Sequence, residues 1–249
     1  MFGWLSKRPP ECPIEEESRE WVERRSAWIV EQFGPEKVLR CPVVLPTSEF
    51  FPQRYLEGPE DALDLFDRVR DYLGVADGRA ELYIVEGRAE KMTNHLVRSD
   101  GPSALGTYQA TDGGPAIICL SVDLLPYPTE VVSTVAHELC HVLLLGDGRV
   151  SAEEEDHEPL TDLLMVFTGF GVFGANTAVR EHVEHVDLGS SWSIASTGYL
   201  REPTWAFALA LFAHMRGEPA PAWRSALTPS VATAFRRSMR YLTERDRPT

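Results

Sequence analysis

The sequence predicts an α+β fold in which helices flank a small antiparallel sheet. In several long segments, apolar residues recur every three or four positions, which is the period of an amphipathic helix. Fewer and shorter apolar runs are typical of strands, and most of them lie between residues 80 and 120. Because strands and helices occupy separate stretches of the chain, the pattern favours the α+β class.

The helices are predicted from this period and from their stop signals. The first has an apolar stripe that includes Trp21 and Ile29, and Gly34-Pro35 ends it. Another is well marked because Pro203 stands in its first turn and a glycine follows its end. The predicted helices are residues 14–33, 60–73, 129–145, a segment from about 159, 203–216 and 230–242.

The strands are predicted from short apolar runs and one turn. A Thr-Asp-Gly-Gly turn at 111–114 separates residues 106–109 from 116–120, so these two segments should form a hairpin. We therefore expect the small sheet to be antiparallel. Further strand candidates are residues 43–45 and 82–85, and residues 192–199 are expected to be extended.

Composition and charge exclude several classes of function. The 249 residues include 24 Lys and Arg against 38 Asp and Glu, which gives a net charge of −14. Nucleic acids and anionic lipids both require clustered cations, so neither partner is expected. The first ten residues lack the apolar core of a signal peptide, and the apolar run at 163–179 fits a buried helix better than a membrane span. Four cysteines without a pairing pattern indicate free thiols, so we expect a cytoplasmic protein.

Residues 137–141, His-Glu-Leu-Cys-His, form an HExxH motif within a predicted helix. Residues four apart lie on one face of a helix, so His137 and His141 can bind one metal ion. Glu138 lies beside both and can take a proton from a metal-bound water. Imidazole suits Zn²⁺, which acidifies water and polarises carbonyl groups, so zinc is the expected cofactor.

A catalytic zinc ion has three protein ligands and one open position, so a third ligand is needed. Asp147 is close, but Leu144 stands where a glycine would have to turn the chain back. Glu158 and Asp162 lie one helical turn apart in the run EEEDHEPLTD. In that arrangement Glu158 binds the metal, and Asp162 accepts the second N–H of a ligating histidine. The alternative third ligands are Asp156, His157 and Asp162.

An HExxH motif followed by a downstream ExxxD resembles the gluzincin class of zinc metallopeptidases. The resemblance covers roughly residues 104–165. It implies that Glu138 is the general base and that Asp162 orients a ligand, above all His137. It also implies a zincin-like fold, with the sheet packed on the HExxH helix, and a peptide or protein substrate. The implied zinc ligands are His137, His141 and Glu158.

Longer stretches resemble a family of uncharacterised bacterial proteins that carry an HExxH motif. These stretches are residues 43–52, 137–141, 155–176 and 198–212. Because they span most of the chain, we expect one compact unit. A mostly helical region of residues 1–78 should pack on a zincin-like metal-binding domain of residues 79–249.

The motif and the resemblance together predict a zinc-dependent hydrolase, and a metallopeptidase above all. Tyr199 is a candidate donor to the oxyanion of the tetrahedral intermediate. Either 106–109 or 117–120 could be the edge strand on which an extended peptide docks. Two alternatives share the motif: a non-catalytic zinc-binding or regulatory module, and a zinc hydrolase of a non-peptide amide.

Other residues of chemical interest have simpler interpretations. Residues 169–174 spell GxGxxG, but no strand precedes them, so we expect close helix packing instead of dinucleotide binding. Cys140 is expected to be a small core residue. A second metal site at His182 and His185 is a weaker alternative to a hydrated loop or helix end.

Overall fold

The computed structural model describes residues 11–86, 106–178 and 200–247. Residues 171–178 of this range are helical. The strands are β1 (Ala80–Val85), β2 (Gly106–Gln109) and β3 (Ala116–Ser121). The helices are α1 (Glu16–Phe33), α2 (Pro35–Leu39), α3 (Pro59–Leu73), α4 (Pro128–His141), α5 (His157–Phe167), α7 (Glu202–Met215) and α8 (Pro229–Arg245), with shorter turns η1 (Val122–Leu124), η2 (Val142–Gly146) and η3 (Ala222–Ala226).

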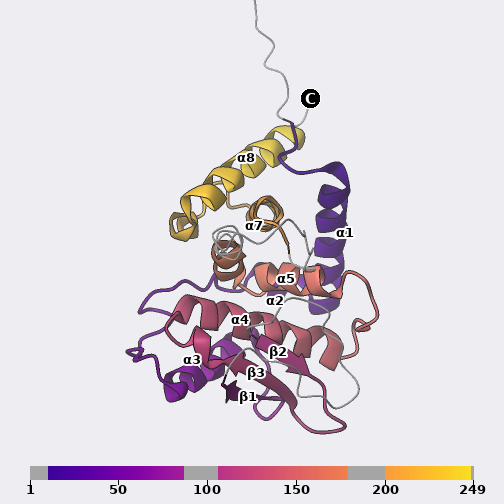
Figure 1. The fold of residues 1–249 in the computed structure, drawn as a ribbon. Coiled ribbons are helices and arrows are strands. Elements are labelled where there is room, and N and C mark those ends of the chain that lie inside the picture. Colours follow the sequence, from indigo (N-terminus) through magenta and orange to yellow (C-terminus); the bar gives the residue numbers. More distant parts are fainter. Residues whose placement is uncertain (1–10, 87–105, 179–199, 248–249) are drawn as a thin grey trace, which may run out of the picture.

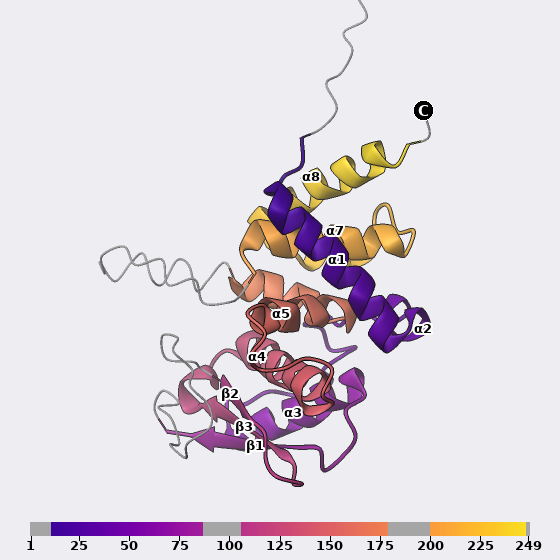
Figure 2. The ribbon, with the colours of Figure 1, turned by 90° about the vertical axis from the view of Figure 1, so that its right-hand side faces the viewer.

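These elements are stacked in layers, with α8 and α7 at one end and the sheet at the other (Figure 1). Helix α4 lies between the sheet and α5, and α5 lies between α4 and α7 (Figure 2). Helix α1 packs against α5 and α7, and α3 packs against α4. The fold is therefore α+β, as predicted.

Local signals explain where the long helices begin and end. α1 stops at Gly34, whose φ of 83° is open to glycine without strain, and Pro35 then begins α2. α3 begins after Gly58, where Asp61 accepts the backbone N–H groups of Gly58 and Leu56. The helices predicted at 14–33, 60–73, 203–216 and 230–242 are confirmed, with ends shifted by three residues or fewer.

The sheet has the strand order β1-β3-β2, so β1 and β2 are its edges. β2 and β3 form the predicted antiparallel hairpin, with Gly106 opposite Leu120. β1 runs parallel to β3, with Ala80 opposite Ala116, so the prediction of a purely antiparallel sheet was wrong. The short turn between β2 and β3 forces an antiparallel pair, whereas no local signal fixes the direction in which the more distant β1 joins β3.

The apolar run at 163–179 is not one helix, because Gly169 interrupts it. This glycine has a φ of 94°, and a Cβ on it would lie 2.2 Å from the carbonyl oxygen of Pro42. Its own carbonyl accepts the N–H of Val44 at 2.9 Å. Residues 43–45 therefore lie beside the interruption between the two helices and are joined to it by this hydrogen bond. They form no strand, so the short strand predicted there was wrong.

The other glycines of the GxGxxG run allow close helix packing, as predicted. A Cβ on Gly171 would lie 2.9 Å from Leu209 of α7, and one on Gly174 would lie 2.3 Å from the ring of Trp205. The helix at 171–178 thus approaches α7 through its glycines. α7 is buried along nearly its whole length, which explains why it is apolar on all sides.

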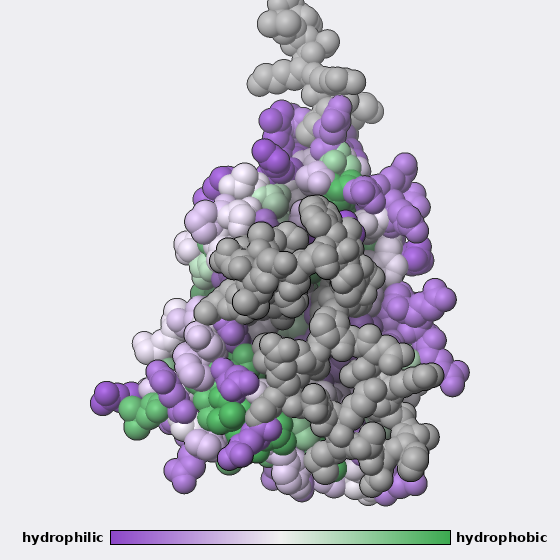
Figure 3. All heavy atoms as spheres, in the orientation of Figure 1, coloured by the Kyte–Doolittle hydropathy of each residue, from purple (hydrophilic) through white to green (hydrophobic). Residues whose placement is uncertain are grey.

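Polar and apolar side chains are unevenly distributed over the surface. On the face drawn in Figure 3, hydrophilic side chains are prominent around α1 and α8, and apolar ones gather near α3 and the sheet. Among the residues described, no helix is long and apolar enough to cross a membrane. All four cysteines are free.

Candidate metal centre

Helix α4 carries the whole HExxH motif at its C-terminal end. Val135 and Leu139 on the same helix are fully buried and hold α4 in the core. The motif side chains share this burial, with only 8% of His137, 5% of Glu138 and 5% of His141 exposed. Because buried ionisable groups are costly unless they are partnered, their partners define the site.

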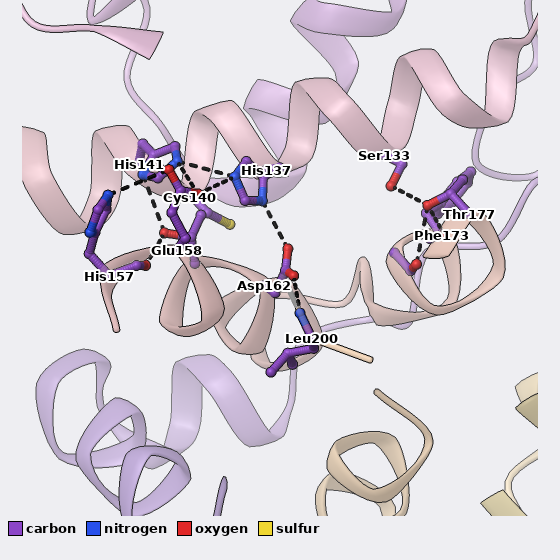
Figure 4. Close-up of polar contacts among 12 residues, drawn as sticks. Ser133, His137, Cys140, His141, His157, Glu158, Asp162, Phe173, Thr177 and Leu200 are labelled. Carbon is purple, nitrogen blue, oxygen red and sulfur yellow. Dashed lines mark hydrogen bonds and ion pairs between the residues drawn. The ribbon is translucent and has the colours of Figure 1, made fainter. Parts of the chain in front are cut away.

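The partners come from α5, which packs against α4 (Figure 4). Glu158, in the first turn of α5, points its Oε2 to Nε2 of His137 at 3.1 Å and to Nε2 of His141 at 3.3 Å. The two Nε2 atoms are 3.1 Å apart. Three potential ligand atoms from two helices thus form a compact triangle that could hold a metal ion. The three residues predicted as ligands are the ones that lie together.

The other ring nitrogen of each histidine is held from outside the triangle. Nδ1 of His137 lies 2.9 Å from Oδ1 of Asp162, whose Oδ2 accepts the N–H of Leu200 at 2.9 Å. Nδ1 of His141 lies 3.3 Å from the hydroxyl of Thr161, which donates its own proton to a backbone carbonyl. Both partners can therefore accept an Nδ1–H. This tautomer leaves the lone pair of each Nε2 facing the triangle.

The triangle has nearly the dimensions of a zinc site. A tetrahedral ion with bonds of about 2.0–2.2 Å keeps its ligand atoms about 3.3–3.6 Å apart. The observed separations of 3.1, 3.1 and 3.3 Å lie at or just below this range. Two lone pairs and a carboxylate that face one another in a buried place repel unless a positive charge lies between them. The residues therefore fit a divalent cation.

The charges around the triangle also favour a cation. Burial lowers the pKa of His141 to about 4, so its ring is neutral at pH 7. Burial opposes protonation of His137 as well, but hydrogen bonds with Asp162 and Glu158 raise its pKa well above the usual value. Burial acts to raise the pKa of Glu158, yet its hydrogen bonds with both histidines hold that pKa far below the usual range. Positive charge is thus favoured between these side chains, either as a proton on His137 or as a bound cation that replaces that proton.

Glu138 lies on the side of α4 that approaches β2. A Cβ on Gly106 would lie 3.1 Å from Oε1 of Glu138 and 2.3 Å from Cγ2 of Thr134, so the bare glycine lets the strand come close. Two residues on, Tyr108 packs its ring against His141, with centroids 5.6 Å apart. Burial raises the pKa of Glu138 to about 7, in the range of a general base at neutral pH. The edge strand beside the motif is therefore β2.

Two of the alternative third ligands are engaged elsewhere. Asp147 pairs with both Arg79 and Arg149, and these bonds outweigh its partial burial and lower its pKa. His157 has its Nδ1 2.7 Å from the carbonyl oxygen of Glu154. It borders the triangle, but it occupies none of its three corners.

Asp156 is bound by the N-terminal helix. It accepts Nε of Arg25 and Nε1 of Trp21, each at 2.7 Å, and the arginine lowers its pKa. These bonds join α1 to the residue just before α5. Asp156 is therefore a structural anchor for the start of the helix that carries Glu158.

The structure does not describe three of the residues that the sequence singled out. Tyr199, His182 and His185 are outside the described residues, so the proposals for them stay predictions. Cys140 is fully buried, with its Sγ 3.9 Å from the hydroxyl of Thr168, which agrees with a core role.

The roles of Thr161 and Arg25 were not predicted from the sequence. Thr161 stands three residues after Glu158, and a hydroxyl at that spacing on the ligand helix was the available signal. Arg25 gave no signal, because its partner lies 131 residues away in the chain.

Comparison of the chain with protein-family models, curated proteins and solved structures finds no match. The resemblance to gluzincins and to the bacterial HExxH family stays a prediction drawn from the motifs. A functional interpretation is therefore supported by the geometry of His137, His141 and Glu158.

Proposed function

We propose that the protein is a zinc-dependent hydrolase that cleaves peptide bonds. The observation that carries the proposal is the triangle of His137, His141 and Glu158, with Glu138 buried beside it. Two imidazoles and one carboxylate are a ligand set of catalytic zinc. Glu138 adds a base to these ligands, and β2 is an edge strand of the described sheet. Zincin-like packing of the sheet against α4 is part of the proposal.

In the proposed mechanism the side chains have separate tasks. Zinc, when bound, would polarise the scissile carbonyl and acidify water. Glu138 takes a proton from the attacking water and delivers it to the leaving nitrogen. Asp162 and Thr161 hold the two imidazole rings in the ligating tautomer. The outer edge of β2 would offer backbone hydrogen bonds to an extended peptide.

Two observations favour this function over its alternatives. The Glu158 side chain is 34% exposed, and a closed structural zinc site does not require such an exposed ligand residue. An edge strand borders the motif, and a strand edge recognises peptides better than other amides.

The variant Glu138→Gln tests the proposal. The amide has the same shape but cannot take the proton, so cleavage of a peptide library should fall by about 10²–10⁴-fold while zinc is retained. Zinc is measured by elemental analysis, and cleavage by mass spectrometry. Glu155→Gln, at an exposed glutamate of the acidic run, is the control. Equal cleavage by Glu138→Gln and wild type, or purified wild type that binds no zinc, would contradict the proposal.

A further inference from the structure

A cavity of about 370 Å³ opens at the C-terminal end of α4, beside the metal centre. One wall is formed by Val142, Leu145 and Gly146 of η2, and another by the turn between β2 and β3. Tyr108 lines the cavity and packs its ring against His141. The ring of Tyr108 therefore lies between the cavity and His141, one of the proposed zinc ligands.

Two hydrogen-bond donors converge on a bare glycine in this cavity. A Cβ on Gly146 would lie 3.4 Å from the hydroxyl oxygen of Tyr108 and 3.5 Å from Nη2 of Arg79. Because Gly146 has no side chain, the space between these donors stays open. Within the part of the chain that the structure describes, neither atom has a hydrogen-bond partner.

The charged side chain that lines the cavity is positive. Arg79 is the one charged residue among the described residues that line the cavity. Its Nη1 pairs with Asp147, but the same carboxylate also binds Arg149, so two guanidinium groups share one negative charge. In a chain with a net charge of −14, this cluster favours an anionic ligand locally.

We infer that the cavity binds a carboxylate of the substrate, held by the guanidinium of Arg79 and the hydroxyl of Tyr108. The inference rests on the proposed peptidase function and adds a substrate preference to it. A strand advances about 3.3 Å per residue, so a peptide extended along β2 passes from Gly106, beside Glu138, to the cavity within about four residues. The carboxylate belongs either to an acidic side chain within about four residues of the scissile bond or to the C-terminus of a short peptide.

Paired peptides test this preference on the zinc-loaded protein. Each pair differs in one carboxylate: Glu against Gln at each position around the cleaved bond, or a free C-terminus against its amide. The kcat/KM of cleavage is measured for wild type, Arg79→Gln and Tyr108→Phe. Binding is measured separately, with each cavity variant placed in the Glu138→Gln background.

Two further variants distinguish the effect of the positive charge on the ligand from the effect of the open space at Gly146. Arg240→Gln, at an exposed ion pair that does not line the described cavity, is the control. Arg149→Gln removes the other arginine on Asp147, so that carboxylate then offsets Arg79 alone and the preference for an anion should decrease. Gly146→Ala fills the space between the donors, and its methyl group meets contacts of only 3.4 to 3.6 Å, so it should fold normally.

Wild type and Arg240→Gln should favour one carboxylate peptide over its amide by about tenfold or more, the size of a hydrogen bond to a charged group. The ratio should fall to near one in Arg79→Gln and decrease in Tyr108→Phe and Gly146→Ala. The pair that shows the preference, side chain or C-terminus, identifies the source of the carboxylate.

The other outcomes distinguish the inference from the proposed function. Cleavage without any carboxylate preference overturns the inference and leaves the peptidase proposal standing. Binding that requires both the carboxylate and Arg79, without cleavage by wild type, supports the cavity assignment and contradicts the peptidase proposal. If the protein neither cleaves nor binds these peptides, both the inference and the peptidase proposal are overturned.

Discussion

The two faces of α5 contribute to this molecule in different ways. Toward α4, α5 presents Glu158, Thr161 and Asp162, each of which meets a histidine. Toward α7 it presents apolar side chains, such as Phe167, whose ring packs against Phe212 with centroids 5.4 Å apart. On the polar face each atom needs one specific partner, whereas on the apolar face shape and volume decide. Changes on the polar face should therefore alter metal binding, and changes in the apolar layer should alter stability alone.

The largest effect on the polar face is expected from Glu158→Ala. Loss of a group that only orients a ligand already costs about 10–100-fold in metal affinity, so loss of a ligand itself should exceed about 100-fold. Competition with a chelator of known affinity measures the change. Glu155→Ala, at an exposed position in the same acidic run, is the control. Unchanged zinc affinity would mean that another residue is the third ligand.

A smaller effect on the same face is expected from Asp162→Asn, about 10–100-fold in zinc affinity, because Nδ1 of His137 loses its carboxylate partner.

Thr161→Val should weaken zinc binding through His141, and Thr161→Ser, which keeps the hydroxyl, should not. Chelator competition measures all three. If Thr161→Ser binds zinc as weakly as Thr161→Val, the hydroxyl does not orient the ring of His141.

The helix at 171–178 packs against α7, as the apolar face of α5 does. At this contact, Gly174→Ala should lower the free energy of unfolding by about 1–3 kcal/mol and leave zinc affinity unchanged. The new methyl group would overlap the ring of Trp205, and overpacked cores lose about this much stability. Denaturant titration measures the loss. The double variant with Trp205→Leu makes room for the methyl group, so its loss should be less than the sum of the single losses. A parallel loss of zinc affinity would erase the contrast between the two faces.

The smallest effect is expected from Arg25→Gln, which loosens α1 from the start of α5. Arg25 lowers the pKa of Asp156, so the pair contributes stability above the unfolded pKa of about 4, and this contribution is lost as the pH falls through the lower folded pKa. Arg25→Gln should therefore cost about 1 kcal/mol at pH 7 and progressively less in acid. Denaturant titrations from pH 7 downward test this, with Arg240→Gln at an exposed pair as the control. A loss that does not change with pH would mean that Arg25 acts by packing alone.

The long helices and the core of the metal site could be predicted because their signals are local. Four-residue spacing places His137 and His141 on one face of any helix, whatever surrounds it. Glycine and proline mark helix ends through their own backbone preferences, as at Gly34 and Pro35. The hairpin of β2 and β3 likewise follows from a short turn.

Three features could not be predicted, because each depends on a distant partner. The direction of β1 depends on how the chain returns to β3, which no local pattern records. Residues 43–45 have a strand-like composition but meet the carbonyl of Gly169 instead of a sheet. The helix predicted from residue 159 is interrupted at Gly169, where the backbone of Pro42 comes too close for a side chain.

By itself the sequence determined the helix that carries the motif and a short set of acidic candidates for the third ligand. Only the tertiary structure separated those candidates. Asp147 pairs with Arg79 and Arg149, and Asp156 with Arg25 and Trp21, so both carboxylates are engaged away from the histidines, and all of these partners except Arg149 are distant in the chain. Glu158 alone among these three turns toward both Nε2 atoms. The physical reason is that a carboxylate follows the nearest positive charge or donor, and in a folded chain that partner is set by packing and not by position in the sequence.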